Sequence, residues 1–372
     1  MTAGNGLPGP SEWLFADSVW WDGRLRHGEA VRLRDGVAVA AVPAAQVPPD
    51  AASRRLPGTL LPGLCDAHVH SALVDLGTVR AGGIAAVWDL GGVPAAVAAL
   101  AERAARRGSG LPRIRHAGPF LTAPGGYPSD RSWAPPGSWR EIHSPADAAE
   151  AVGEAHAAGA TIIKVTLHAG GPMPSPATLR ALVDAAGGLG LPVVAHAEGA
   201  GTVAAAYEAG AGLLAHTPWT ETLDAGLVRD CAARMTWLST LDIHGWGGPD
   251  PARDTAIGNL RAFLGQGGAV RYGTDLGNGP LPPGINPREI RALRQAGLSP
   301  DDILTAMTGP GRPCADGSAS PTGPAVSPGP VDSDVMAGEP CWIPGGLTLE
   351  PDGFADALAT ARVVGPEVRP RG

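Results

Sequence analysis

Between about residue 60 and residue 308, short apolar runs alternate with alanine-rich stretches whose apolar residues recur at helical spacing. Such alternation is typical of βαβ units, in which each parallel strand leads through a helix to the next. The predicted strands cover residues 63–70, 85–89, 113–117, 161–166, 192–196, 213–216, 236–241 and 270–275. Eight strand–helix units predict an α/β fold of the closed (β/α)8, or TIM, barrel type. A doubly wound open sheet is the structural alternative, but no glycine-rich phosphate loop follows the first predicted strand.

The segments on either side of this region are expected to form a small β domain. From Trp13 to Leu60, short strand-like runs are separated by Asp-Gly turns. From Gly309 to Pro330 the chain is rich in glycine, proline and serine, and weak strand character resumes at residues 339–344 and 357–364. We expect this tail to return and complete the N-terminal sheet. The expected limits are 1–58 for the first part of the small domain, 59–315 for the barrel, and 316–372 for the loop and the second part.

Charge and apolar content exclude several classes of protein. The formal net charge of −8 argues against a nucleic-acid partner or an anionic membrane surface, since both require a basic patch. No run approaches the roughly 18 apolar residues that a membrane span needs. The four cysteines, Cys65, Cys231, Cys314 and Cys341, lack CxxC spacing and suit free thiols in a reducing compartment. We therefore expect a cytoplasmic protein that acts on a small-molecule substrate; a homo-oligomer is compatible with the sequence.

Ionisable side chains stand where the predicted strands end. His68 and His70 flank Val69, and residues two apart on a strand point to the same side. Four further side chains close later apolar runs: Lys164, His196, His216 and Asp275. The carboxyl ends of barrel strands form one face, where catalysis takes place. Two histidines packed in a protein core would also give the His68-Val69-His70 pattern. Burying six ionisable groups without partners, however, would cost several kcal/mol apiece. The whole set therefore predicts a metal site.

Lys164 is the only lysine among 28 basic residues. Arginine stays protonated at any working pH, whereas a desolvated lysine can lose its proton. A chance survivor on the surface is the alternative, but Lys164 ends the apolar run Thr161-Ile-Ile. This position favours a function that requires a neutral amine.

Seven segments together resemble the successive strand motifs of the amidohydrolase superfamily, and most of all its imidazolonepropionase- and prolidase-like branch. They are Pro62–His70, Ile84–Gly92, Ala117–Gly126, Ile162–Val165, Ala195–Gly199, Ala215–Thr217 and Gly273–Asp275. The resemblance covers residues 10 to 310 in the correct order. It implies a barrel with a β-sandwich domain formed by the two terminal segments, and a metal-dependent hydrolase with two divalent ions, Zn²⁺ being the expected metal.

The resemblance also implies a role for each ligand. His68 and His70 would bind the more buried ion, and His196 and His216 the more exposed one. Lys164, carboxylated by CO₂, would bridge the two ions, which suits a pair of dications better than an ammonium group does. Asp275 would bind the first ion and act as general base. The implied reaction is cleavage of a C–N bond, amide or dipeptide-like, by a metal-bridging hydroxide.

Some positions depart from the family or leave the function open. Gly125-Gly126-Tyr127 stands where many relatives have Gly-Gly-His, and the usual C-terminal strand with an Ala-Asp-Leu-Val core is replaced by the run from Glu339 to Pro344. The candidate substrate contacts are Tyr127, His168, His244 and Trp219. Glu198 resembles a proton-donating glutamate of deaminases, although a surface or outer-sphere carboxylate is the favoured interpretation. The alternatives are a deaminase or a cyclic-amide or lactone hydrolase on the same frame, and a non-catalytic relative, which should have lost ligands.

Overall fold

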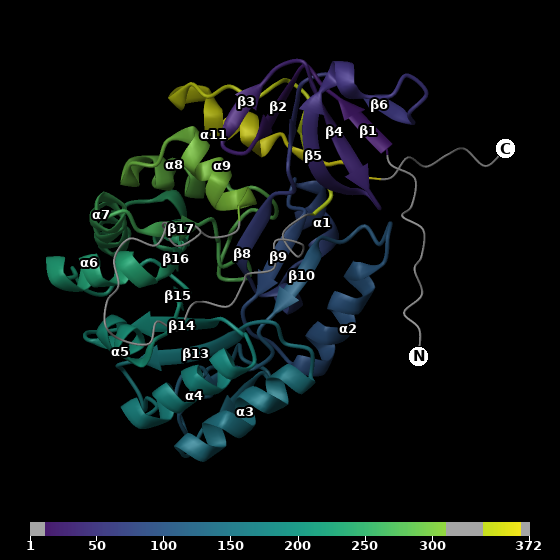
Figure 1. The fold of residues 1–372 in the computed structure, drawn as a ribbon. Coiled ribbons are helices and arrows are strands. Elements are labelled where there is room, and N and C mark those ends of the chain that lie inside the picture. Colours follow the sequence, from purple (N-terminus) through teal and green to yellow (C-terminus); the bar gives the residue numbers. More distant parts are fainter. Residues whose placement is uncertain (1–11, 310–337, 366–372) are drawn as a thin grey trace, which may run out of the picture.

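The computed structural model describes residues 12–309 and 338–365. The strands near the two ends of the described chain form two small sheets at one end of the molecule (Figure 1). One sheet has the order β5 (Val37–Pro43), β4 (Glu29–Arg34), β1 (Glu12–Phe15), β6 (Ser53–Arg55). The other has the order β19 (Arg362–Val363), β18 (Cys341–Ile343), β7 (Thr59–Leu61), β2 (Ser18–Trp21), β3 (Arg24–Arg26). Both sheets contribute to one apolar cluster, in which Leu14 and Val31 from the first meet Val19 and Leu60 from the second.

The C-terminal segment returns to the N-terminal one, as predicted. Strand β18 pairs antiparallel with β7 and with β19. The strand predicted over residues 357–364 is partly wrong, because α11 (Pro351–Ala359) occupies its first half and only the short β19 follows. Phe354, Ala355 and Leu358 are buried at helical spacing, which explains the helix. Most of the Gly309–Pro330 loop and Cys314 lie outside the described residues, whereas Cys65, Cys231 and Cys341 are buried free thiols.

The parallel strands lie in two sheets that hydrogen-bond to each other. A three-stranded sheet has the order β10 (Arg113–His116), β9 (Ala86–Asp89), β8 (Cys65–Val69). A seven-stranded sheet has the order β12 (Trp139–Glu141), β11 (Phe120–Thr122), β13 (Ile163–His168), β14 (Val193–Glu198), β15 (Leu213–Leu214), β16 (Thr236–Leu238), β17 (Ala269–Arg271). Val69 bridges in parallel to Leu276 beyond β17, and the N–H of Thr161 donates to the His116 carbonyl at 3.0 Å. The eight predicted strands all overlap observed ones; β11 and β12 were not predicted.

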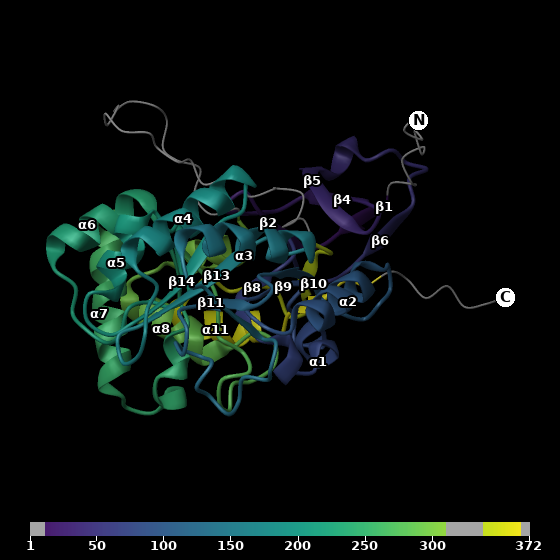
Figure 2. The same ribbon diagram turned by 90° about the horizontal axis from the view of Figure 1, so that it is seen from below.

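Helices lie outside the parallel strands (Figures 1 and 2). They are α1 (Leu76–Ala81), α2 (Pro94–Ala105), α3 (Pro145–Ala157), α4 (Pro176–Gly188), α5 (Thr202–Ala209), α6 (Ala225–Arg234), α7 (Pro251–Gly265), α8 (Pro287–Ala296) and α9 (Pro300–Thr308). Short 3-10 turns are η1 (Ala44–Gln46), η2 (Ser71–Leu73), η3 (Leu241–Ile243) and η4 (Gly245–Gly247). Side-chain caps set several helix starts; for example, Ser144 accepts from the N–H of Asp147 at the start of α3, and Asp224 accepts from the N–H groups of Gly226 and Leu227 at the start of α6. Within the described ranges, no helix combines the length and apolar character that a membrane span requires.

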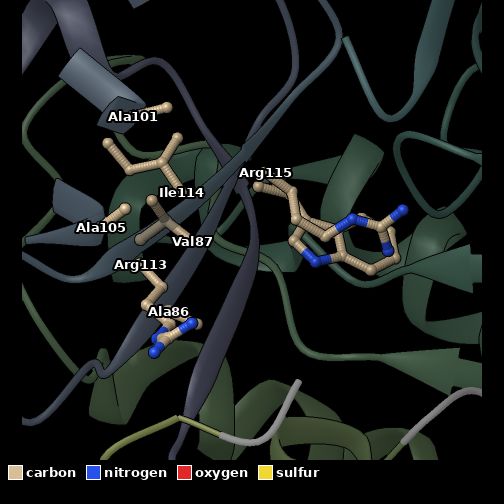
Figure 3. Close-up of a pocket in the computed structure, with 8 residues that line it drawn as sticks. Ala86, Val87, Ala101, Ala105, Arg113, Ile114 and Arg115 are labelled. Carbon is tan, nitrogen blue, oxygen red and sulfur yellow. The ribbon is translucent and has the colours of Figure 1, made fainter. Parts of the chain in front are cut away.

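A small cavity of about 90 Å³ lies between α2 and the beginnings of β9 and β10. Figure 3 shows Val87, Ala101, Ala105 and Ile114 around it, with Arg115 directed away from them. The guanidinium of Arg115 lies over the Trp88 ring, 5.1 Å from the ring centroid. This cavity borders the starts of β9 and β10. His68 lies near the end of β8 and His70 just beyond it, whereas Lys164, expected at a strand end, is the second residue of β13, which continues to His168.

Candidate metal centre

His68 near the end of β8 and His70 just after it each have the Nδ1 ring nitrogen close to a backbone carbonyl oxygen. Nδ1 of His68 lies 2.7 Å from the carbonyl oxygen of Ala215, and Nδ1 of His70 lies 3.2 Å from that of Gly91. A carbonyl only accepts, so each Nδ1 carries the proton, and in the neutral ring Nε2 keeps its lone pair. Both Nε2 atoms are therefore available as ligands.

Asp275 faces both of these lone pairs. Its Oδ1 lies 3.1 Å from Nε2 of His68 and 3.1 Å from Nε2 of His70, yet this buried oxygen has no hydrogen bond of acceptable geometry within the described chain. Its Oδ2 accepts from the amide of Asn278 at 2.9 Å. Burial by itself would raise the pKa of Asp275, but the neighbouring histidines hold it well below its usual range. A carboxylate oxygen and two ring nitrogens that converge without hydrogen bonds fit a cation between them.

His216 lies next to this group. Its Nδ1 is 2.9 Å from the Thr240 hydroxyl, and its ring centroid is 4.6 Å from that of His68 and 5.0 Å from that of His196. Ligand atoms of His68, His216 and Asp275 all lie within 4.8 Å of one another. Burial lowers the pKa of His68 and of His216 well below the usual value, so both rings are neutral at pH 7. His216 thus stands between the two ligand groups expected from the sequence.

Lys164 is buried in β13, with 1% of its surface exposed. Burial lowers the pKa of its amine from 10.5 to about 7, and the charge of Asp275 opposes that change only in part. The charge of Lys164 opposes protonation of all four histidines of the set, namely His68, His70, His196 and His216. Burial lowers the pKa of His68, His196 and His216, whereas Asp275 raises the pKa of His70 overall, against the effect of burial. The lysine is therefore close to the histidines and is largely neutral slightly above pH 7.

A second group combines His168, His196 and Glu198. Oε2 of Glu198 lies 3.0 Å from Nε2 of His196 and 3.2 Å from Nδ1 of His168. In the register of β13 with β14, His168 pairs with Glu198. Their ligand atoms lie within 4.8 Å of one another, a second arrangement able to hold a metal ion. The spacing of two between His196 and Glu198 places both side chains on one face of β14.

The candidate substrate contacts surround these groups. The Tyr127 ring stacks on the His196 ring at 4.9 Å. The Trp219 ring lies 5.3 Å from that of His216 and 5.1 Å from that of His244. Burial raises the pKa of the Tyr127 phenol above its usual value, so it remains a hydrogen-bond donor.

Two aspartates that were not predicted as site residues hold the segments that carry the candidate ligands. Asp66 accepts from the N–H of His68 at 3.1 Å and from the Thr274 hydroxyl at 2.5 Å, so it ties β8 to the segment that carries Asp275. Asp89 accepts from the N–H and the hydroxyl of Ser71 and from the N–H of Gly91. Each aspartate lies inside a strand motif, which was the only sequence signal. Such partners orient first-sphere ligands.

No family model matches the sequence, and neither does any curated protein. Solved structures do match. A putative prolidase from Bifidobacterium longum has a TM-score of 0.66 and 23% identity, covering 81% of this chain and 82% of that chain. A structure described as an amidohydrolase has a TM-score of 0.70 and 18% identity, covering 96% and 100%. Ochratoxinase from A. niger has a TM-score of 0.67 and 18% identity, covering 81% and 83%. The chain thus has a mixed α/β fold that it shares with amidohydrolase and prolidase structures.

Proposed function

We propose that this chain is a metal-dependent hydrolase that cleaves a C–N bond of an amide or dipeptide-like substrate. The observation that carries the proposal is the convergence of His68 Nε2, His70 Nε2 and Asp275 Oδ1 at 3.1 Å without a hydrogen bond. Solved structures of similar fold described as a prolidase, a Xaa-Pro dipeptidase and molinate hydrolase support the reaction type.

The proposal includes the architecture around the centre. The hydrogen bonds that link the two parallel sheets support a single closed (β/α)8 barrel, and the apolar cluster shared by the small sheets supports a separate β-sandwich. In a closed barrel, β8, β13 and β14 and the segments that follow β15 and β17 would surround one interior. All six proposed ligands come from these elements, with Lys164 near the start of β13.

The residues present fit two divalent ions, with Zn²⁺ favoured by the neutral imidazoles and carboxylate. His68, His70 and Asp275 would hold the inner ion, and His196 and His216 the outer one. Lys164 would bridge them once its neutral amine has added CO₂, because a lysine with a pKa of about 7 has the free lone pair that this addition needs. Bound ions would lower the pKa of water toward about 7 and polarise the scissile carbonyl.

The chain's own groups would manage the proton. The pKa of Asp275 lies well below its usual range, so its carboxylate is ionised and could take a proton and hand it to the leaving nitrogen. The Tyr127 phenol, stacked on His196 and still protonated, would donate a hydrogen bond to a substrate oxygen.

The metal proposal is tested by elemental analysis of protein expressed in zinc-supplemented medium, which should give close to two divalent ions per chain. Lys164→Arg should lose the bridged pair while its far-ultraviolet circular dichroism stays that of the wild type. Finding no metal in the wild type, or an unchanged metal content in the variant, would contradict the proposed centre. A screen of N-acyl amino acids, dipeptides, cyclic amides and lactones then separates C–N hydrolysis from its rivals.

A further inference from the structure

Next to His70 lies a cavity of about 160 Å³ whose walls are largely apolar. The large apolar side chains in its wall are those of Leu73, Val97, Leu100, Phe120 and Trp133. His70 is the one ionisable residue among the described residues that line it. A group bound there would meet hydrocarbon and aromatic rings rather than charges.

The cavity adjoins the candidate metal centre through His70, which lines it. The rest of its lining comes from the segments that follow β8 and β9, from α2, and from Phe120, the first residue of β11, with the loop that follows β11. The centroid of the His70 ring lies 5.7 Å from that of the Phe120 ring, and the Phe120 centroid lies 6.1 Å from that of the Trp133 ring. His70 is thus a shared wall, with the ligand set on one side and the cavity on the other. The polar group of His168 and Glu198 belongs to β13 and β14.

Two further observations point to a ligand. Leu73 and Trp133 are large apolar side chains with 52% and 45% of their surface exposed, and such exposure marks binding surfaces. Ser138, which also lines the cavity, is 1% exposed, and its hydroxyl has no hydrogen-bond partner among the described residues. An apolar cavity of roughly 150 Å³ is large enough to bind benzene.

We propose that this cavity binds an aryl group of the substrate, phenyl or hydroxyphenyl, and so selects substrates with an aromatic substituent near the scissile bond. The substrate selectivity in this inference rests on the proposed hydrolase function. The binding itself needs neither metal nor turnover.

Binding is tested with fluorobenzene as the probe, followed by ¹⁹F NMR line broadening on the purified full chain. Ala96 and Ala99 are exposed alanines on α2, and Ala96 alone of the two lines the cavity. Ala96→Phe should weaken binding at least tenfold, whereas Ala99→Phe, the matched control, should bind as the wild type does. Trp133→Ala removes part of the cavity wall and should also weaken binding. This second variant keeps the test decisive if the new ring of Ala96→Phe points out to solvent and leaves the cavity open. A wild type that does not bind the probe, or unchanged affinity in both cavity variants, overturns the proposal.

Selectivity is tested with N-phenylacetyl, N-(4-hydroxyphenyl)acetyl and N-acetyl derivatives of one amino acid. Single methylenes in apolar pockets change specificity by about 10-fold or more, so the ratio of kcat/KM for phenylacetyl over acetyl should be on the order of a hundred. Ala96→Phe should reduce that ratio at least tenfold, and Ala99→Phe should leave it unchanged. Preference for the hydroxyphenyl substrate would assign the Ser138 hydroxyl to it. Probe binding without hydrolysis of any substrate would contradict the proposed function alone; equal rates for phenylacetyl and acetyl would overturn the aryl assignment.

Discussion

Replacing Lys164 by methionine should stabilise the metal-free chain, although it would destroy the proposed centre. Methionine keeps most of the side-chain volume and removes the amine, so packing losses should stay under about 1.5 kcal/mol. Burial lowers the pKa of Lys164 from 10.5 to about 7. At about 1.36 kcal/mol per pH unit, this drop corresponds to a cost of about 5 kcal/mol when the buried amine is charged.

The cost depends on pH in a defined direction. The folded-state pKa of Lys164 lies below the unfolded value, so between pH 7 and 10.5 the unfolded chain binds a proton that the folded chain does not. The destabilisation is therefore complete below pH 7 and disappears as the pH rises toward 10.5. From the two pKa values, the electrostatic gain in Lys164→Met should be about 4 kcal/mol at pH 7, about 3 kcal/mol at pH 8 and about 2 kcal/mol at pH 9.

The assay is urea unfolding of chelator-treated wild type and variant in CO₂-free buffer, at several pH values between 6.5 and 9.5. Because Lys164 is the only lysine, lysine labelled with ¹³C at Cε gives a single NMR signal whose titration reads its pKa directly. A titration midpoint near 10.5, or a stability difference that does not change with pH, would refute the burial of this amine. Loading the wild type with metal and CO₂ should reverse the order of stability, because bound ligands stabilise only the folded state.

The remaining predictions concern the proposed ligand Asp275 and one glycine. Asp275→Asn should retain metal by elemental analysis but lower kcat about 10²- to 10⁴-fold, since the amide cannot take the proton; an unaffected rate would remove Asp275 from proton transfer. Gly91→Ala should lower the free energy of unfolding by about 3 kcal/mol, because its φ is +144° and an added Cβ would lie 2.4 Å from the Phe120 ring. Gly110→Ala is the matched control, with a φ of +73° and open space around its Cβ, and should cost only about 1 kcal/mol; equal losses in thermal unfolding would contradict the clash with Phe120.

The order of the elements and the places of His68, His70, His196 and Asp275 toward or just beyond the carboxyl ends of parallel strands could be predicted from the sequence, whereas Lys164 lies near the start of β13 rather than at its end. Short apolar runs and apolar residues that recur every 3.6 positions are local patterns, so strands and helices can be recognised from them. Parallel strands have their carboxyl ends on the same side of the sheet, whatever segments connect them. The single lysine could be found from the composition, because the number of residues of each type does not depend on the fold.

Only the tertiary structure decided how these residues are paired. Asp66 bonds to Thr274, 208 residues away, and Nδ1 of His68 meets the Ala215 carbonyl, 147 residues away. Residues 357–359 read as strand, but the burial of Phe354 and Leu358 makes them helical. The neutral amine of Lys164 and the apolar cavity beside His70 both depend on which distant segments exclude water, and a one-dimensional pattern carries no information about that exclusion.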